Sequence, residues 1–228
     1  WNDEIPESLK DYYDKERYLK AKEYKKARGK ISLISSLMSI VITLVILMSG
    51  FYGIVSDYIF EIYSSSFLHS GFFFLFFYLI NLFVSIPISY YSTFVIEEKF
   101  GFNKTTNKIF IIDLIKGLFV SIIIGGALLA AALFIYDYFN DGFWLWLWLV
   151  LSVFTLFMSM FYTSLIVPIF NKLSPLEDGS LKEKIQKYSD KIGYSLKNIF
   201  IIDGSKRSSK ANAYFSGFGP KKIGESCK

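Results

Sequence analysis

Four long stretches of the chain contain no charged side chain, and they constrain its fold more than any other feature. They are Ile31–Ser56, Ile62–Ile96, Gly117–Tyr136 and Gly142–Asn171. A helix rises about 1.5 Å per residue, so about 20 apolar residues cross a hydrocarbon core of roughly 30 Å. Each stretch is long enough for such a helix. The sequence therefore predicts an all-α polytopic membrane bundle with four transmembrane helices, surrounded mainly by lipid.

The charged residues are concentrated between the apolar stretches. Nine Lys and Arg residues lie in Trp1–Lys30, three in Ser92–Lys108 and twelve after Pro168, whereas Ser56–Ser66 and Asp137–Asp141 contain none. Because Lys and Arg favour cytoplasmic loops, we expect the three basic segments, including both chain ends, to be cytoplasmic. The net charge of +5 then reports orientation. Seven acidic residues among the nine basic ones of the first segment argue against a nucleic-acid partner.

This pattern divides the chain into three regions. Residues 1–30 are predicted to form a cytoplasmic juxtamembrane helix that begins near Ile5 and ends at Gly29. Residues 31–170 form the four-span membrane region, and residues 171–228 form a small α+β soluble domain. The spans are expected at about residues 31–54, 66–91, 109–136 and 143–170.

The tail has the pattern of an incomplete domain. Ser180–Glu183 predicts a helix start with a capping box, and Gly193 predicts the end of that helix. Asn198–Asp203 and Asn212–Phe218 are expected to be two strands that form a hairpin. One helix and one hairpin are too little for an independent domain, so we expect part of this domain to be absent.

Histidine and cysteine are too rare for the common metal sites. Cys227 is the single cysteine and His69 the single histidine. This excludes an internal disulfide, a cysteine-rich metal site and a zinc site built on two histidines of this chain. His69 lies in an aromatic run at the outer end of a span, where we expect an interfacial position. We assign no metal ligand within the chain.

Two ionisable residues, Asp113 and Lys116, lie one turn apart at the start of the third span. An ionisable group inside a span is costly unless it is paired or faces water. The two residues can form a local ion pair near the interface. Alternatively, they line a polar wall of an internal cavity. The residues alone leave both interpretations open.

Two motifs resemble segments of a known family. They are Thr93–Thr106 (TFVIEEKFGFNKTT) and Asp203–Gly219 (DGSKRSSKANAYFSGFG). Both resemble segments of the integral-membrane CAAX prenyl proteases, which are zinc metalloendopeptidases. The order of motifs and spans also agrees, so the resemblance covers essentially the whole chain. It implies a ring of seven membrane helices around a water-filled chamber, with a zinc site at the cytoplasmic end.

The resemblance also implies roles for particular residues. Asn212, Ala213 and Tyr214 would lie on the edge strand of a zincin-like domain, along which an extended substrate hydrogen-bonds. An ordinary sheet strand is the alternative. Further candidates for the chamber or its loop are Glu97, Glu98, Asn103, Asp113 and Lys116.

The family's catalytic sequence, His-Glu-x-x-His, does not occur in the chain. By resemblance, one family helix would precede Trp1 and two would follow Lys228. The ending Ile223–Lys228 looks like a truncation or a shifted reading frame, where the family would continue with an apolar strand. We therefore expect a fragment lacking the zinc site. Zinc would belong to the full-length parent, and this chain alone would bind none and be inactive.

The predicted family reaction is peptide-bond hydrolysis near prenylated C-termini or in membrane proteins. The expected partners are the lipid bilayer and a peptide or protein with a membrane-associated C-terminus; the sequence indicates no oligomeric state. One alternative is a heat-shock type of membrane quality-control metalloprotease. Another is a non-catalytic scaffold derived from a protease. The abundance of Lys, Ile, Phe and Asn suggests a bacterial inner membrane.

Overall fold

The computed structural model describes residues 14–193, 196–216 and 222–227. Its backbone packs as two units, Trp1–Asn103 and Lys104–Lys228. The boundary between them falls after the second predicted span. It does not follow the predicted division at residues 30 and 170, which stays a prediction.

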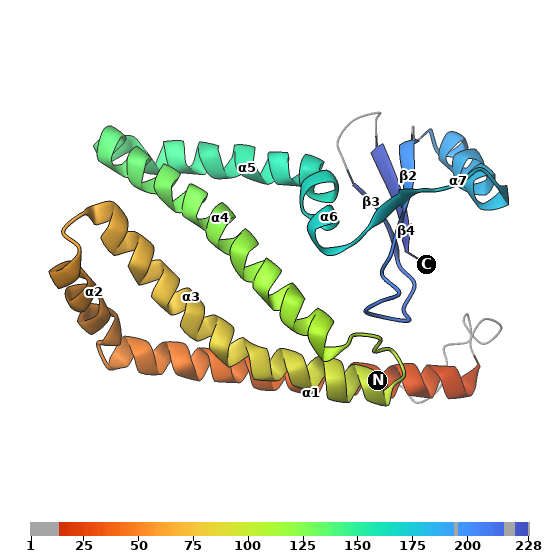
Figure 1. The fold of residues 1–228 in the computed structure, drawn as a ribbon, viewed down its shortest axis with the longest axis horizontal. Helices are drawn as coiled ribbons and strands as arrows, with labels where there is room; N and C mark the ends of the chain where they lie inside the picture. The colour runs from red at the N-terminus through yellow and green to blue at the C-terminus, as the bar shows by residue number, and fades with distance from the viewer. Residues whose placement is uncertain (1–13, 194–195, 217–221, 228) are drawn as a thin grey trace. The chain divides into compact units, whose positions relative to one another are not determined.

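The first unit contains one long helix, α1, over Lys15–Met48 (Figure 1). The Asp14 carboxylate accepts a hydrogen bond from the Glu16 backbone N–H and caps its start. The predicted stop at Gly29 is wrong, because α1 continues through it. A single glycine inside a helix costs only about 1 kcal/mol, which the helix formers around it offset. No break therefore separates the predicted juxtamembrane helix from the first span, and the predicted start at Ile5 lies outside the described residues.

The first span ends earlier than the predicted Ile54. Gly50 has φ of 68°, in the left-handed region that favours glycine, and the chain turns there. A separate helix that the sequence analysis missed, α2, follows over Phe51–Ile62. It packs on the next helix through aromatic rings, with the centroids of Tyr52 and Phe77 4.6 Å apart.

The second span has the predicted bounds. Helix α3 covers Ser66–Tyr91 and continues as a π-helical segment, η2, over Ser92–Glu97. Pro87 lies inside α3, and the regular α-helix continues for one turn beyond it before η2 begins. Within this unit α1, α2 and α3 contact one another.

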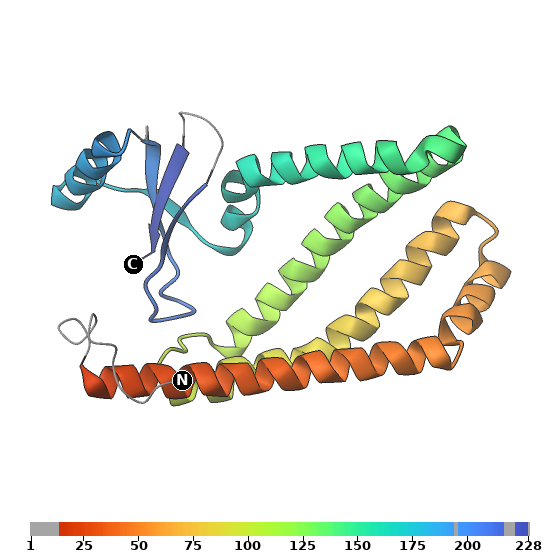
Figure 2. The ribbon, with the colours of Figure 1, turned by 180° about the vertical axis from the view of Figure 1, so that it is seen from behind.

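The second unit begins with two spans. Helix α4 covers Asn107–Phe139 and α5 covers Phe143–Leu165; a 3-10 turn, η3, joins them over Asn140–Gly142. Figure 2 shows α4 and α5 meeting at this turn and diverging from it. A short helix, α6, follows over Val167–Phe170 with Pro168 in its first turn, where the missing N–H has no helical partner to lose.

The apolar helices expose their side chains. Among the described residues, four helices are long and apolar enough to cross a membrane, and at most 11% of the apolar window of any of them is buried. Phe83 is 79% exposed and Ile123 is 69% exposed. Leaving apolar area in water costs about 25 cal/mol per Å². This surface is therefore compatible with lipid and not with water, in agreement with the predicted membrane bundle.

A small mixed sheet ends the chain. Its strands are β1 (Leu173–Pro175), β2 (Leu196–Ile202), β3 (Ala213–Ser216) and β4 (Lys222–Cys227). The order is β1-β2-β4-β3, with β2 and β4 parallel and the other pairs antiparallel. The predicted hairpin of β2 and β3 is wrong, because β4 lies between them and pairs with both. Residues 222–227, where no strand was expected, thus form an interior strand of the sheet.

Helix α7, over Ser180–Lys191, contacts β2. The predicted capping box is wrong, because Gly179 is the N-cap residue and Ser180 is already helical. An ion pair of 2.7 Å between Lys182 Nζ and Asp178 Oδ1 lies at this end instead. The hydrogen bond from Lys182 lowers the pKa of the Asp178 carboxyl. Gly193, with φ of 69°, ends the helix as predicted.

Candidate functional sites

The motif at residues 97–103 is held by a side chain of α1. The Tyr24 hydroxyl donates to Glu97 Oε1 over 2.5 Å. The Tyr24 ring meets Phe100 and Phe102 edge-to-face, with centroids 5.3 and 5.0 Å away. Phe100 is 5% exposed, so these rings form a small local core. Glu97 therefore joins η2 to α1, whatever further role it has.

The other predicted residues of this loop bond to one another. Asn103 Nδ2 donates to Glu98 Oε2 over 2.9 Å, and the Asn103 backbone N–H donates to the Glu97 carbonyl over 3.3 Å. Gly101 has φ of 76°, which lets the chain turn within the motif. Arg28 Nη1 lies 3.6 Å from Glu97 Oε1 at the solvent-accessible side of the cluster. The motif thus forms a closed, hydrogen-bonded loop.

Asp113 pairs with an arginine 94 residues away in the sequence. Arg207 Nε and Nη2 donate to the two Asp113 carboxylate oxygens over 2.6 and 2.8 Å. Arg207 Nη1 donates to Asn171 Oδ1 over 2.8 Å, and Nη2 also donates to the Phe170 carbonyl over 2.9 Å. The Arg207 and Asp113 side chains are 28% and 25% exposed. Hydrogen bonding to Asp113 raises the pKa of the Arg207 guanidinium, which stays charged.

Lys116 does not pair with Asp113 as the local interpretation proposed. Its Nζ donates to the Ile169 carbonyl over 2.7 Å. Two cations thus satisfy carbonyls at the end of α6, where the helix leaves them without helical partners. We call this cluster the Arg207 junction; it consists of Asp113, Lys116, Asn171 and Arg207 with the carbonyls of Ile169 and Phe170. Whether Asp113 and Lys116 also border a chamber stays a prediction.

Asn212, Ala213 and Tyr214 lie at the start of β3, at an edge of the sheet. Among the described strands only β4 pairs with β3, in a register of Ala213 with Ser226 and Tyr214 with Glu225. Asn212 Oδ1 accepts a hydrogen bond of 2.9 Å from the Ala213 N–H. Asn212 and Ala213 are exposed. The outer side of β3 thus pairs with no other described strand, and helix α5 also contacts β3.

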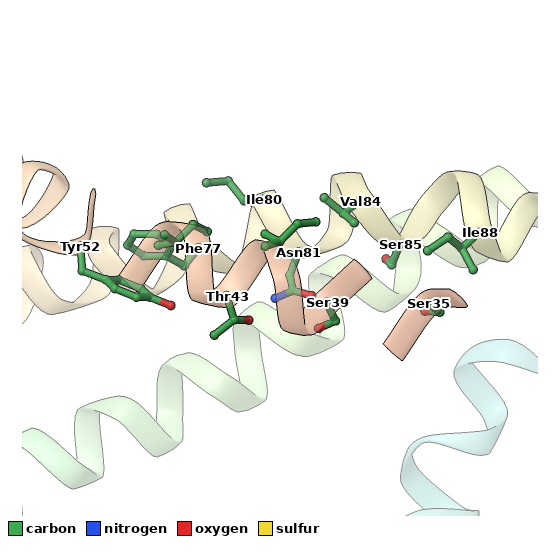
Figure 3. A pocket seen from close by; sticks show the side chains of 12 residues that line it. Ser35, Ser39, Thr43, Tyr52, Phe77, Ile80, Asn81, Val84, Ser85 and Ile88 are labelled. Carbon is green, nitrogen blue, oxygen red and sulfur yellow. The ribbon is translucent and has the colours of Figure 1, made fainter. Parts of the chain in front are cut away.

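A cavity of about 140 Å³ lies between α1 and α3. Figure 3 shows Asn81 of α3 pointing toward Ser39 and Thr43 of α1. Polar groups at membrane depth favour water or protein over lipid. We therefore expect this face to border water or another helix. The polar lining residues are Ser35, Ser39, Thr43, Tyr52, Asn81 and Ser85.

The described residues do not fit a zinc site. They contain no group of three His, Cys, Asp or Glu side chains that could hold a metal. His69 Nε2 lies 3.1 Å from both Oγ and the carbonyl oxygen of Ser56, and its ring meets Phe60 edge-to-face. His69 therefore links α2 to α3.

A family model described as CAAX prenyl protease N-terminal, five membrane helices, matches residues 1–172. The chain belongs to the CAAX prenyl protease family. The match covers both units up to the residue before β1. Of the membrane helices in that description, the described residues contain four candidates.

Three members of the CAAX prenyl protease family show how far the similarity extends. CAAX prenyl protease 1 of Saccharomyces cerevisiae is 50% identical over 135 residues, which are 59% of this chain and 30% of that protein. A homolog from Dictyostelium discoideum is 35% identical over 231 residues, 96% of this chain and 53% of the relative. The crystal structure of S. mikatae Ste24p has a TM-score of 0.88 and 37% identity, covering 98% of this chain and 54% of that chain.

The chain spans about half the length of the last two CAAX prenyl proteases. Family membership and the apolar helices make it an integral multi-pass membrane protein. The expected bacterial inner membrane gains no support, since these relatives are eukaryotic.

The partners of Asp113 and Glu97 could not be predicted from the sequence. Asp113 in a span indicated either a paired charge or contact with water, and Arg207 lies in the tail motif Asp203–Gly219. Nothing in the sequence selects Arg207 from the twelve basic residues after Pro168. Tyr24 was one of several tyrosines interleaved with charges, and no local pattern distinguished it.

Proposed function

We propose that the chain forms the membrane part and the substrate strand of an endopeptidase that cleaves near a prenylated or otherwise membrane-associated C-terminus. The observation that supports this proposal best is the outer edge of β3 in a member of the CAAX prenyl protease family. A peptide paired along this edge would be extended, which exposes one carbonyl to attack. Asn212, Ala213 and Tyr214 would be its contact residues.

Zinc would be held by residues outside this sequence. The chain has one histidine, and the described residues contain no ligand cluster. In such enzymes zinc activates a water molecule and polarises the scissile carbonyl. The residues of this chain would bind and align the peptide. We expect the isolated chain to bind no zinc and to cleave no peptide.

Five polar residues would border the chamber or support its loop. They already have partners that fix their positions, which suits groups that hold a chamber wall in shape. The polar lining of the cavity between α1 and α3 would be costly against lipid, so that face would border either chamber water or another helix. The five are Glu97, Glu98, Asn103, Asp113 and Lys116.

We also propose that both basic ends lie on the cytoplasmic side, as the distribution of Lys and Arg indicates. Tags at the two ends should become accessible to antibody together, after selective permeabilisation of the plasma membrane. Accessibility from opposite sides would contradict this orientation. The heat-shock type and the scaffold alternative gain no supporting observation from the structure.

A chimera tests the peptidase proposal. Residues 1–216 of this chain would replace the matching segment of S. mikatae Ste24p, and a prenylated CAAX peptide would be the substrate. We expect cleavage that a zinc chelator abolishes, and no cleavage by residues 1–228 alone. Absence of cleavage by a folded chimera, or cleavage by the isolated chain, would contradict the proposal.

Contact with β3 is tested by photo-crosslinking. A photoreactive residue at Ala213 should crosslink the prenylated peptide in the chimera. The same residue at the exposed Gln186 of α7 serves as the matched control and should not. Equal crosslinking at both positions would argue against β3 as the substrate strand.

A further inference from the structure

The loop between β2 and β3 is fixed at its centre by Arg207. The Arg207 and Ser208 N–H groups both donate to the Gly204 carbonyl, over 3.0 and 3.1 Å, which forms a tight turn. The Arg207 carbonyl accepts from the Lys104 N–H over 3.0 Å and from Thr105 Oγ1 over 3.1 Å. The backbone at Arg207 is thus bound directly to the segment that leads into α4.

The Arg207 side chain adds a second attachment. Its guanidinium makes four hydrogen bonds, to both Asp113 oxygens, to Asn171 Oδ1 and to the Phe170 carbonyl. Only a planar fork with several fixed N–H groups can serve these acceptors together, so a lysine cannot replace it. One residue therefore joins the β2–β3 loop to a membrane span and to the end of α6.

Strand β3 is short and lies at the edge of the described sheet. It has four residues, pairs with β4 on one side and begins six residues after Arg207. A short edge strand opens easily, because few contacts hold it. An edge that is to pair with an incoming peptide must keep its N–H and C=O groups in register. The Arg207 junction ties the loop before this strand to α4 and to the end of α6, in addition to the direct contact between β3 and α5.

We propose that Arg207 is a positioning residue that holds the substrate strand β3 in register by tying its loop to Asp113 of α4 and to the end of α6. The importance of this position for peptide binding rests on the proposed function, but the positioning itself does not. Lys206, the neighbour of Arg207, provides the matched control. Its side chain is 63% exposed and pairs with Asp203, which belongs to the same loop.

Hydrogen exchange of residues 1–228 in lipid nanodiscs tests the proposal. For Arg207→Lys we expect about tenfold faster exchange of the β3 amides at residues 213–216, with β1 and β2 changing less than about twofold. Lys206→Ala should leave β3 unchanged. The double variant Arg207→Lys with Asp113→Asn should exchange no faster than Arg207→Lys alone, because both remove the same interaction. Unchanged β3 exchange in Arg207→Lys, or equal acceleration of all strands, would overturn the proposal.

Adding a prenylated CAAX peptide separates this proposal from the function. Protection of β3 by the peptide in the unmodified chain, weakened several-fold in Arg207→Lys, is the expected result. Absence of peptide protection with accelerated β3 exchange in Arg207→Lys would contradict the substrate strand and uphold the positioning role. Equal peptide protection of β3 in the unmodified chain and in Arg207→Lys, together with unchanged β3 exchange, would support the substrate strand and contradict the positioning role.

Discussion

Glu97 in the first unit and Asp113 in the second are held in different ways. Each carboxylate meets a partner far along the chain, 73 residues away for Glu97 and 94 for Asp113. Glu97 accepts from the Tyr24 phenol beside a buried aromatic cluster, whereas Asp113 binds Arg207 through both oxygens. Ring packing and a hydrogen bond from a neutral phenol therefore characterise the first site, and a bidentate ion pair characterises the second. A carboxylate near the end of a span can thus be held by a neutral phenol beside aromatic rings or by a guanidinium.

The largest expected effect comes from neutralising the two carboxylates in matched variants. Asp113→Asn should lower the free energy of unfolding by about 2 kcal/mol, because it leaves a partly buried guanidinium without its counter-charge. Glu97→Gln should cost about 1 kcal/mol, since the amide oxygen still accepts from the Tyr24 hydroxyl. Unfolding of the purified chain in detergent would measure both. Equal costs would refute the contrast.

Tyr24→Phe removes the hydrogen bond at the first site and keeps the ring. We expect a loss of about 1 kcal/mol in the free energy of unfolding, below the full value for a bond to a charged group because the site is partly exposed. Tyr58→Phe, on an α2 side chain that is 65% exposed, is the control and should be neutral. A loss as large as that of Tyr24→Ala would mean that the ring contacts contribute nothing.

Arg28→Ala tests whether an ion pair contributes to stability at the Glu97 site. Arg28 lies 3.6 Å from Glu97, donates to Ser92 Oγ over 2.8 Å and has a side chain that is 50% exposed. Such pairs contribute about 0.5 kcal/mol or less, and salt screens them. Stability measurements at low and high salt should show a small loss that disappears at high salt. A loss comparable to that of Asp113→Asn would place the first site among the ionic anchors as well.

The smallest effect is expected at acid pH in the loop that carries Arg207. The hydrogen bond from Lys206, with help from Ser205, lowers the pKa of Asp203 below its ordinary 3.8. A carboxyl with a lowered pKa contributes stability that is present above 3.8 and is lost as the pH falls through its folded-state value. Hydrogen exchange of residues 203–208 should therefore accelerate slightly below pH 3.8. Asp203→Asn should remove this pH dependence, and its persistence would exclude Asp203 as the cause.

Features that depend on local pattern were predictable. Span lengths follow from runs of apolar residues, so the bounds of α3 and the start of α5 could be placed closely. The predicted end near residue 170 was not that of α5, which ends at Leu165 before the separate helix α6. Gly193 ended its helix as expected, because its positive φ is a local property. Gly29 did not, because a glycine inside a strong helix costs too little to break it.

Features that depend on distant pairing were not predictable. Strand β2 can pair either with β3 or with β4, and no residue of the connecting turns indicates which pairing is more stable. The placement of β4 between β2 and β3 therefore could not be predicted. The sequence indicated that Asp113 is either paired or faces water, and it contained many candidates for a paired cation. The edge position of Asn212–Tyr214 was inferred by resemblance. It is observed in the order of the described strands, in which β4 pairs with one side of β3.

By itself, the sequence determined that the chain lies in lipid, how many apolar helices it forms and which family it resembles. The reason is that the lengths of the apolar runs and the order of the motifs can be read directly from consecutive residues. Only the tertiary structure decided that Arg207 binds Asp113, that Tyr24 binds Glu97 and that β3 lies at an edge of the described sheet. Those outcomes depend on which surfaces meet in space, and contacts between residues 70 to 100 positions apart leave no local signature.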